Sequence, residues 1–290
     1  MFIGTLTAIV TPFRNGELDE QAFGDLIEWQ IANGTNGIVP CGTTGESATL
    51  THQEHHRVVE LTVEVVNRRI PVIAGTGSNS TAEAVSLTKH AKQAGADGAL
   101  IITPYYNKPM QEGLYRHYKA IAESVDLPQI LYNIPGRTGV NMLPSTVARL
   151  CGLQNIVGIK EGSGSVQQAS EIVSTCGDRI TVLAGDDALT LPMMAVGGKG
   201  VISVTSNIVP SQMAQLVQAF LSSRIDEARR IHSALSPLFN ALFYETNPIP
   251  VKTALGLMGK IDPELRLPLC AMAAETKDKL TRVLKDAGLI

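Results

Sequence analysis

The sequence predicts a (β/α)8 barrel of the α/β class, a TIM barrel, with extra helices at its C-terminal end. Apolar, β-branched runs recur eight times before residue 207, and each run stops at small or turn-forming residues. The runs are continuously apolar, which is typical of parallel strands covered on both faces. Amphipathic stretches separate them, so strand and helix alternate as a barrel requires.

The eight predicted strands are taken in order from the N-terminus. They are residues 4–12, 37–45, 71–77, 98–104, 128–136, 156–162, 180–187 and 200–206. A doubly wound open sheet is the rival architecture, and eight even repeats disfavour it. The apolar start of the chain lacks a basic leader and a small-residue cleavage site, so we interpret it as the first strand and not as a signal peptide.

Helix-start signals precede some of the amphipathic stretches. In a capping box, a hydroxyl and a carboxylate satisfy free amides of the first helical turn. The sequence contains two such pairs, Thr51 with Glu54 and Ser80 with Glu83. These signals predict helices that begin near residues 52 and 81. Further helices are expected at residues 83–95, 113–125 and 212–223.

About 80 residues follow the eighth predicted strand, and they have a helical pattern throughout. Residues 226–244, 251–259 and 270–288 carry this pattern, with no linker or low-complexity segment before them. We therefore divide the chain into a catalytic barrel, residues 1–224, and a C-terminal helical extension packed on the barrel, residues 225–290.

Composition and charge exclude several classes of protein. Hydrophobic residues make up 44% of the chain and charged residues 18%, which favours a large core over disorder. The net charge is −3 and no basic run occurs, so neither nucleic acid nor a membrane surface is the expected partner. The four cysteines form no CxxC pair and no apolar run is long enough to span a bilayer, which favours a cytoplasmic protein.

Lys160, at the end of the sixth predicted strand, is the first candidate for chemistry. The segment 156–162 is apolar up to this lysine, and burial of an uncompensated ammonium group is unfavourable. One interpretation is a strand-end lysine whose charged group reaches water. The barrel favours the other interpretation, because the C-terminal mouth of the strands carries the active site of such folds.

Other polar residues fall at the same end of other predicted strands. They are Thr43 and Thr44 after the second strand, Tyr105 and Tyr106 after the fourth, and Tyr132 and Arg137 at the fifth. A partly desolvated lysine has a lowered pKa, and its free amine attacks a carbonyl to form an imine. Neighbouring hydroxyls would relay protons, so this chemistry needs neither a metal nor an organic cofactor.

The turn at residues 42–47, Gly-Thr-Thr-Gly-Glu-Ser, is a candidate pocket for a carboxylate. Gly42 and Gly45 allow tight or positive-φ backbone, so that successive amides and two threonine hydroxyls converge on an anion. Such a turn is more often an ordinary loop. Arg137 would bind a second carboxylate through two parallel hydrogen bonds. The alternative interpretation of Arg137 is an ordinary surface ion pair.

Seven motifs in order make the sequence resemble the dihydrodipicolinate synthase family, among the Schiff-base-forming, pyruvate-dependent class I aldolases. They lie at residues 42–50, 71–85, 103–109, 130–139, 156–162, 185–187 and 247–252, and span nearly the whole chain. The resemblance implies a barrel with three C-terminal helices. It also implies condensation of pyruvate with L-aspartate 4-semialdehyde to 4-hydroxy-tetrahydrodipicolinate, the committed step of diaminopimelate and lysine biosynthesis.

The resemblance further implies roles for particular residues. Lys160 would form a covalent imine with pyruvate, and Thr44, Tyr106 and Tyr132 would make the proton relay. Tyr106 would reach into the neighbouring subunit's site, which implies at least a dimer. The resemblance implies that the usual assembly, a homotetramer built as a dimer of dimers, is formed here. The substrates would be held by Thr43 and Thr44 at the pyruvate carboxylate, by Arg137 at the semialdehyde carboxylate, and by Gly185 and Ile202.

Lysine-inhibited members of the family carry an allosteric lysine site at a subunit interface. By the resemblance it would be lined here by Ser47, Ala48, His52, His55, Asn79, Glu83 and Tyr105. Each position carries the residue type that this site needs, and Glu83 would pair with the ammonium group of L-lysine. We therefore expect L-lysine to act as an inhibitor.

Related activities and a different class remain as alternatives. Sialic acid lyases and keto-deoxy sugar aldolases share the imine machinery, but they act on polyhydroxylated substrates. Arg137, within the motif Pro-Gly-Arg-Thr-Gly, favours a second substrate that bears a short carboxylate. A barrel that only senses a keto acid is the other alternative, and a pure binder has no need of a proton relay.

Three other loci receive structural interpretations. His52 and His56 share one helix face, but spacing supplies no third ligand, so no metal site is predicted. The glycine-rich stretch 197–200 precedes the eighth strand, at the face opposite the active site. Cys41 has no histidine beside it in the sequence, and we interpret it as a small buried hydrophobic residue.

Overall fold

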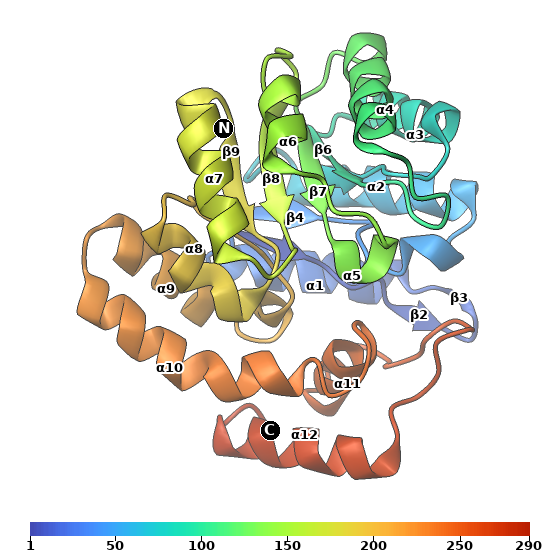
Figure 1. Cartoon of the computed structure of the whole chain (residues 1–290). Helices are drawn as coiled ribbons and strands as arrows, with labels where there is room; N and C mark the ends of the chain where they lie inside the picture. The colour runs from blue at the N-terminus through green and yellow to red at the C-terminus, as the bar shows by residue number, and fades with distance from the viewer.

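The computed structural model describes all 290 residues, and eight parallel strands form a barrel inside a ring of helices (Figure 1). The barrel strands are β1 Gly4–Ala8, β4 Gly37–Val39, β5 Ile73–Gly75, β6 Gly98–Ile102, β7 Gln129–Asn133, β8 Ile156–Glu161, β9 Thr181–Ala184 and β10 Gly200–Ser203. Their order is β4-β1-β10-β9-β8-β7-β6-β5, and a bridge between Ile38 and Val72 closes the ring. The predicted TIM barrel is confirmed.

Helices follow the strands and cover the outside of the barrel (Figure 1). They are α1 Glu20–Ala32, α2 His52–Val66, α3 Thr81–Ala94, α4 Gln111–Ser124, α5 Pro135–Thr138, α6 Pro144–Leu150, α7 Val166–Cys176, α8 Thr190–Ala195 and α9 Pro210–Leu221. The short helix α5 and the helix α6 both follow β7. None of the helices combines the length and the apolarity that a bilayer crossing needs.

The core has two layers, which explains why the strands are apolar without alternation. A cluster of 62 buried residues lies outside the barrel, between the strands and the surrounding helices and among the C-terminal helices. A second cluster fills the inside of the barrel, and its members are Leu6, Ala8, Val39, Ile73, Leu100, Ile130, Tyr132, Leu183 and Ile202. Both faces of the strands are therefore buried, as expected for parallel strands inside a layer of helices.

The two predicted capping boxes have different outcomes. Thr51 and Glu54 form a complete capping box at the start of α2. At α3, the Ser80 hydroxyl accepts from the Glu83 amide at 3.4 Å, but the Glu83 carboxylate does not return to Ser80. It accepts instead from the Ser78 hydroxyl and lies 2.8 Å from His52 Nε2. The second box is thus wrong in its carboxylate half, because tertiary partners hold Glu83.

The first predicted strand ends early and leads into a small hairpin. β1 stops at Ala8, and β2 Phe13–Arg14 pairs antiparallel with β3 Glu17–Leu18. Asn15 and Gly16 form the turn with φ of 56° and 83°, the backbone that an Asn-Gly hairpin turn adopts. This hairpin later receives contacts from the C-terminal part of the chain.

Three helices form the C-terminal extension, below the barrel in the view of Figure 1. They are α10 Ile225–Ala241, α11 Ile249–Leu257 and α12 Ala274–Asp286, where the sequence predicts helical stretches. α10 packs on α9, and α12 packs on both α10 and α11. The division of the chain after residue 224 stays a prediction, because α9 and α10 contact one another extensively across it.

Candidate active site

Lys160 lies inside the mouth of the barrel. It stands in register with Tyr132 of β7 and Leu183 of β9, and both of these side chains belong to the interior cluster. Residues in register share a face of the sheet, so Lys160 points inward as well. Its side chain is buried with 5% exposure, and Nζ lies 4.3 Å from the centre of the Tyr132 ring. Nζ makes no hydrogen bond or ion pair within the chain.

The surroundings shift the pKa values of both groups. Burial lowers the pKa of Lys160 to about 8, with Arg137 acting in the same direction and Asp187 against it. Burial also raises the pKa of the Tyr132 phenol to about 12, while Arg137 and Thr43 oppose that rise. Near pH 8, an amine that is free about half the time therefore lies against a protonated phenol. This pairing suits a nucleophile with a proton donor beside it.

The pH dependence of imine formation follows from the Lys160 pKa. Only the neutral amine attacks a carbonyl, so the rate of imine formation with pyruvate should rise with pH and level off above about 8. An ordinary lysine, with a pKa of about 10.4, would still be gaining reactivity at that point. Borohydride trapping at subsaturating pyruvate, from about pH 6 to pH 10, measures the profile. A rate that rises steadily to pH 10 would contradict the lowered pKa.

The turn at residues 42–47 presents free backbone donors. The amides of Gly45, Glu46 and Ser47 are used inside the turn, on the carbonyl oxygens of Gly42 and Thr43. The amides of Gly42, Thr43 and Thr44 donate to no acceptor in the chain. Three successive free N–H groups beside two threonine hydroxyls make a suitable anion pocket.

The role expected of the turn's glycines is partly wrong. Positive φ occurs at Cys41, 53°, and at Glu46, 54°, on either side of the turn, and not at Gly42 or Gly45. Gly45 is needed for close approach instead, because a Cβ there would lie 3.2 Å from both Cys41 N and Ile9 O. The turn is therefore tight because Cys41 and Glu46, and not the two glycines, adopt positive φ.

Arg137 and Thr44 are held by one residue from the C-terminal part of the chain. Arg137 Nη2 donates to the Asn247 carbonyl oxygen at 3.0 Å. The Asn247 side-chain amide donates from Nδ2 to Thr44 Oγ1, also at 3.0 Å. Thr44 and Asn247 are both buried, whereas Arg137 lies exposed on α5 at the barrel mouth. The structure therefore brings the predicted hydroxyl and the guanidinium to a common anchor.

A cavity of about 450 Å³ opens beside these groups. Thr43, Tyr132, Arg137 and Asn247 line it, and Lys160 lies next to it through its contact with the Tyr132 ring. Leu100 and Ile102 supply part of the apolar wall. A concave, largely apolar site with a few converging polar groups is the usual form of a small-molecule site.

Comparison with known families decides the assignment. The model of the dihydrodipicolinate synthetase family matches residues 1–287. The chain belongs to this family. Its relative from Geotalea daltonii, named 4-hydroxy-tetrahydrodipicolinate synthase, is 62% identical over 290 residues, with 100% of both chains covered.

Solved structures of the dihydrodipicolinate synthetase family agree with this fold over its whole length. The enzyme of Acinetobacter baumannii, complexed with pyruvate, is 48% identical with a TM-score of 0.98, and 100% of each chain is covered. The enzyme of Cyanidioschyzon merolae, with lysine bound, is 42% identical with a TM-score of 0.97, covering 100% of this chain and 99% of that one. Both identities are high enough for the arrangement of the barrel to carry over.

The predicted lysine-site residues of this dihydrodipicolinate synthetase family member lie together. Six of the seven line the same cavity as Tyr132, and they are Ser47, Ala48, His52, His55, Glu83 and Tyr105. Asn79 does not line the cavity, and its carbonyl accepts from Asn107 Nδ2 at 2.9 Å. His55 Nε2 lies 2.8 Å from the Gly75 carbonyl, and burial lowers the pKa of His55 to about 4. This imidazole is neutral at ordinary pH.

Tyr105 and Tyr106 do not behave alike within one chain. Tyr105 lines the cavity, but Tyr106 is 89% exposed and adopts a φ of 71°, an unfavourable backbone for a bulky residue. The single chain therefore does not bring Tyr106 to its own Tyr132 and Thr44. Strained, exposed aromatic residues are typical of a contact surface.

Gly185 and Ile202 occupy supporting positions beside the site. The Gly185 amide donates to the Glu161 carbonyl oxygen at 2.8 Å, and a Cβ at Gly185 would lie 2.9 Å from that oxygen. Ile202 is fully buried in the interior cluster. Neither residue lines the cavity beside Tyr132, so their predicted contacts with substrate stay predictions.

Sequence reasoning missed two residues of this site. Asn247 and Asp187 belong to the motifs at 247–252 and 185–187, but nothing in their spacing gave them a role. Asp187 is buried, and its Oδ2 accepts from the amides of Val204 and Thr205 at 3.0 and 2.8 Å. Burial raises the pKa of Asp187. No local pattern marks either residue, because each role depends on a contact with a distant part of the chain.

Three further loci, Cys41, the histidines of α2 and the stretch 197–200, lie outside the proposed chemistry. Cys41 is buried, and burial raises the pKa of its thiol well above the ordinary value. His52 contacts Glu83, whereas the His56 ring stacks on His90 with centroids 3.6 Å apart. The stretch 197–200 leads into the N-terminal end of β10, away from the mouth that holds Lys160.

Proposed function

We propose that this chain is a 4-hydroxy-tetrahydrodipicolinate synthase, which condenses pyruvate with L-aspartate 4-semialdehyde through an imine on Lys160. The observation that carries the proposal is the Lys160 amine, buried without a polar partner against Tyr132, with a pKa of about 8. The name of the relative that is 62% identical supports the choice of substrates.

The mechanism begins with pyruvate. The free amides of residues 42–44 and the hydroxyls of Thr43 and Thr44 bind its carboxylate, and the neutral Lys160 amine attacks its keto carbon. Loss of water gives the imine. The protonated imine withdraws electrons, so the methyl carbon loses a proton and becomes an enamine nucleophile. That carbon then attacks the aldehyde of the second substrate.

Each proton transfer needs a donor or acceptor near the reacting carbon. Tyr132 lies against Lys160 and keeps its proton, since burial raises its pKa to about 12. In our proposal the relay runs from Tyr132 through Thr44 to Tyr106 of a neighbouring subunit. The exposure of Tyr106 supports a contact with a second subunit, which needs at least a dimer, and we propose a homotetramer. The cysteine pattern supports a cytoplasmic location. The proposal invokes no cofactor, because the imine on Lys160 itself serves as the electron sink.

A coupled assay with pyruvate and L-aspartate 4-semialdehyde tests the proposal directly. We expect turnover, and we expect borohydride reduction with pyruvate alone to add one pyruvyl mass at residue 160. A chain that forms the adduct but does not consume the semialdehyde would be a different pyruvate-dependent aldolase. A chain that binds pyruvate without any adduct would be a sensor.

The second substrate distinguishes this activity from the sugar-acid aldolases. Arg137→Ala should raise the KM for the semialdehyde and lower turnover by about 10-fold to 1000-fold, because a charge-assisted pair with the substrate carboxylate is lost. Imine formation with pyruvate should survive, since Lys160 and the turn are unchanged. The measurement is a kcat and KM determination beside borohydride trapping. Wild-type use of the semialdehyde by Arg137→Ala would contradict the assignment.

We also propose that L-lysine inhibits this enzyme from the part of the cavity lined by His52, His55, Glu83 and Tyr105. The lysine-bound structure of the Cyanidioschyzon merolae enzyme supports the choice of ligand. Glu83→Gln should raise the lysine concentration for half inhibition by about 10-fold, since a charged partner of the ammonium is removed. Titration of the coupled assay with lysine measures this. Uninhibited activity at millimolar lysine would contradict the proposal.

A further inference from the structure

Asn247 joins the C-terminal part of the chain to two groups of the active site. Its side chain donates to Thr44 Oγ1, and its main-chain oxygen accepts from Arg137. Asn247 is buried, and its Oδ1 atom has no hydrogen-bond partner in the chain. Asn247 is not a member of the proposed proton relay, although no other residue forms hydrogen bonds with both of these groups.

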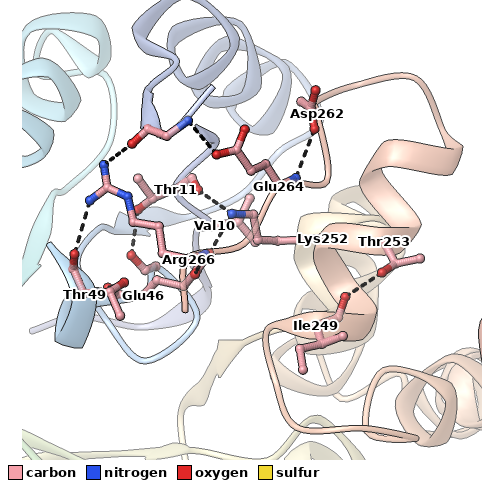
Figure 2. Close-up of polar contacts among 12 residues, drawn as sticks. Val10, Thr11, Glu46, Thr49, Ile249, Lys252, Thr253, Asp262, Glu264 and Arg266 are labelled. Atoms are coloured by element: carbon pink, nitrogen blue, oxygen red, sulfur yellow. Dashed lines mark hydrogen bonds and ion pairs between the residues drawn. The ribbon is translucent and has the colours of Figure 1, made fainter. Parts of the chain in front are cut away.

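A buried ion pair fixes the distance between the two segments. Lys252 Nζ, on α11, lies 2.6 Å from Glu46 Oε1 and donates to the Thr11 carbonyl oxygen at 2.9 Å (Figure 2). Glu46 follows Thr44 by two residues, and Lys252 follows Asn247 by five. The Arg266 amide donates to the other Glu46 oxygen at 3.3 Å (Figure 2). The turn that carries Thr44 is therefore clamped to the segment that carries Asn247.

The hydrogen-bonding capacity of one hydroxyl gives Asn247 a task. A threonine hydroxyl has one hydrogen to donate and two lone pairs that accept. The Asn247 amide occupies one lone pair and offers no acceptor to the hydroxyl hydrogen. The Thr44 hydroxyl therefore keeps its hydrogen to donate and one lone pair to accept. A proton relay needs both, because each member accepts one proton and passes on another.

We propose that Asn247 is a positioning residue, which orients the Thr44 hydroxyl for proton transfer by donating its side-chain amide to Oγ1. The proposal deepens the synthase function and rests on it. Without the amide the hydroxyl rotates among several partners. With an acceptor in place of the amide, the hydroxyl hydrogen is captured and turned away from the reacting centre.

Two variants of Asn247 distinguish a role in orienting the Thr44 hydroxyl from a purely structural role. Asn247→Ala removes the donor and should lower kcat by about 10-fold, whereas Asn247→Asp supplies an isosteric acceptor and should lower kcat by about 100-fold or more. The kcat of Asn247→Asp, divided by the wild-type kcat at the same pH, should rise as the pH falls, because a protonated carboxyl donates to Oγ1 as the amide does. In Asn247→Ala the KM for the semialdehyde should stay within about 3-fold, since Arg137 contacts the main-chain oxygen.

Asn240→Asp is the matched control, because Asn240 lies exposed on α10 and gains the same charge in the same extension. It should leave kcat unchanged. Equal losses of kcat in Asn247→Ala and Asn247→Asp, with a ratio of Asn247→Asp to wild type that does not rise at low pH, would reduce Asn247 to structural support and overturn the proposal. Full activity of Asn247→Asp would overturn it as well, since an acceptor would then serve Thr44 equally well.

A double-mutant cycle tests whether Asn247 acts through Thr44. Thr44→Val removes the hydroxyl, so adding Asn247→Asp should cause little further loss of kcat. Losses that multiply would contradict the proposal. Its failure is distinct from failure of the synthase function, because the wild-type chain would still condense its two substrates, and borohydride trapping would still label Lys160.

Discussion

Lys160→Met is expected to abolish turnover, with a loss on the order of 10⁴-fold or more. The methionine side chain fills a similar volume among Tyr132 and Leu183 but has no nitrogen to attack pyruvate. Without the imine the methyl carbon of pyruvate has no electron sink and does not become a nucleophile. The coupled assay measures the loss, and intact mass after borohydride reduction with pyruvate should show no adduct.

Lys89→Met is the control for this experiment, because Lys89 is an exposed lysine of α3 that makes no ion pair. It should keep both turnover and the adduct. An adduct in Lys160→Met would mean that another lysine is the nucleophile. A loss of turnover below tenfold would mean that the reaction does not depend on an imine at this position. Either result would remove the basis of the proposed mechanism.

The sequence is most informative where the signal is local. Continuous apolar runs locate the barrel strands, because a strand buried on both faces needs no polar alternation. Lys160 and Tyr132 stand out for the same reason, since each interrupts such a run at its C-terminal end. Their proximity then follows from the closure of the barrel, which gathers those ends at one mouth.

The sequence is less informative where a tertiary partner competes with a local pattern. Ser80 and Glu83 have the spacing of a capping box, but His52 and Ser78 hold the carboxylate. Asn247 contacts a residue 203 positions away, and that contact depends on how the extension packs on the barrel. No local pattern carries this information, because both partners are ordinary polar residues in loops.

Lys252→Met is expected to destabilise the fold by about 3–5 kcal/mol. Lys252 and Glu46 have side chains 0% and 1% exposed, with Nζ and Oε1 2.6 Å apart. Burial lowers the pKa of Lys252, and the Glu46 carboxylate opposes that effect. Removal of the lysine leaves a carboxylate in the interior with the Arg266 amide as its remaining hydrogen-bond donor. Urea unfolding measures the loss of stability.

Two comparisons separate the effect of an unpaired buried charge on stability from the effect of lost packing at Lys252. Glu46→Gln combined with Lys252→Met removes both charges, so it should be more stable than Lys252→Met alone. Lys279→Met breaks the exposed pair with Glu275 on α12 and should change stability little. If Lys252→Met lost no more stability than Lys279→Met, the ion pair between α11 and the turn at residues 42–47 would be dispensable for the fold. A marked loss in Lys252→Met should also lower the affinity for pyruvate, because Glu46 and the amides of residues 42–44 belong to one turn.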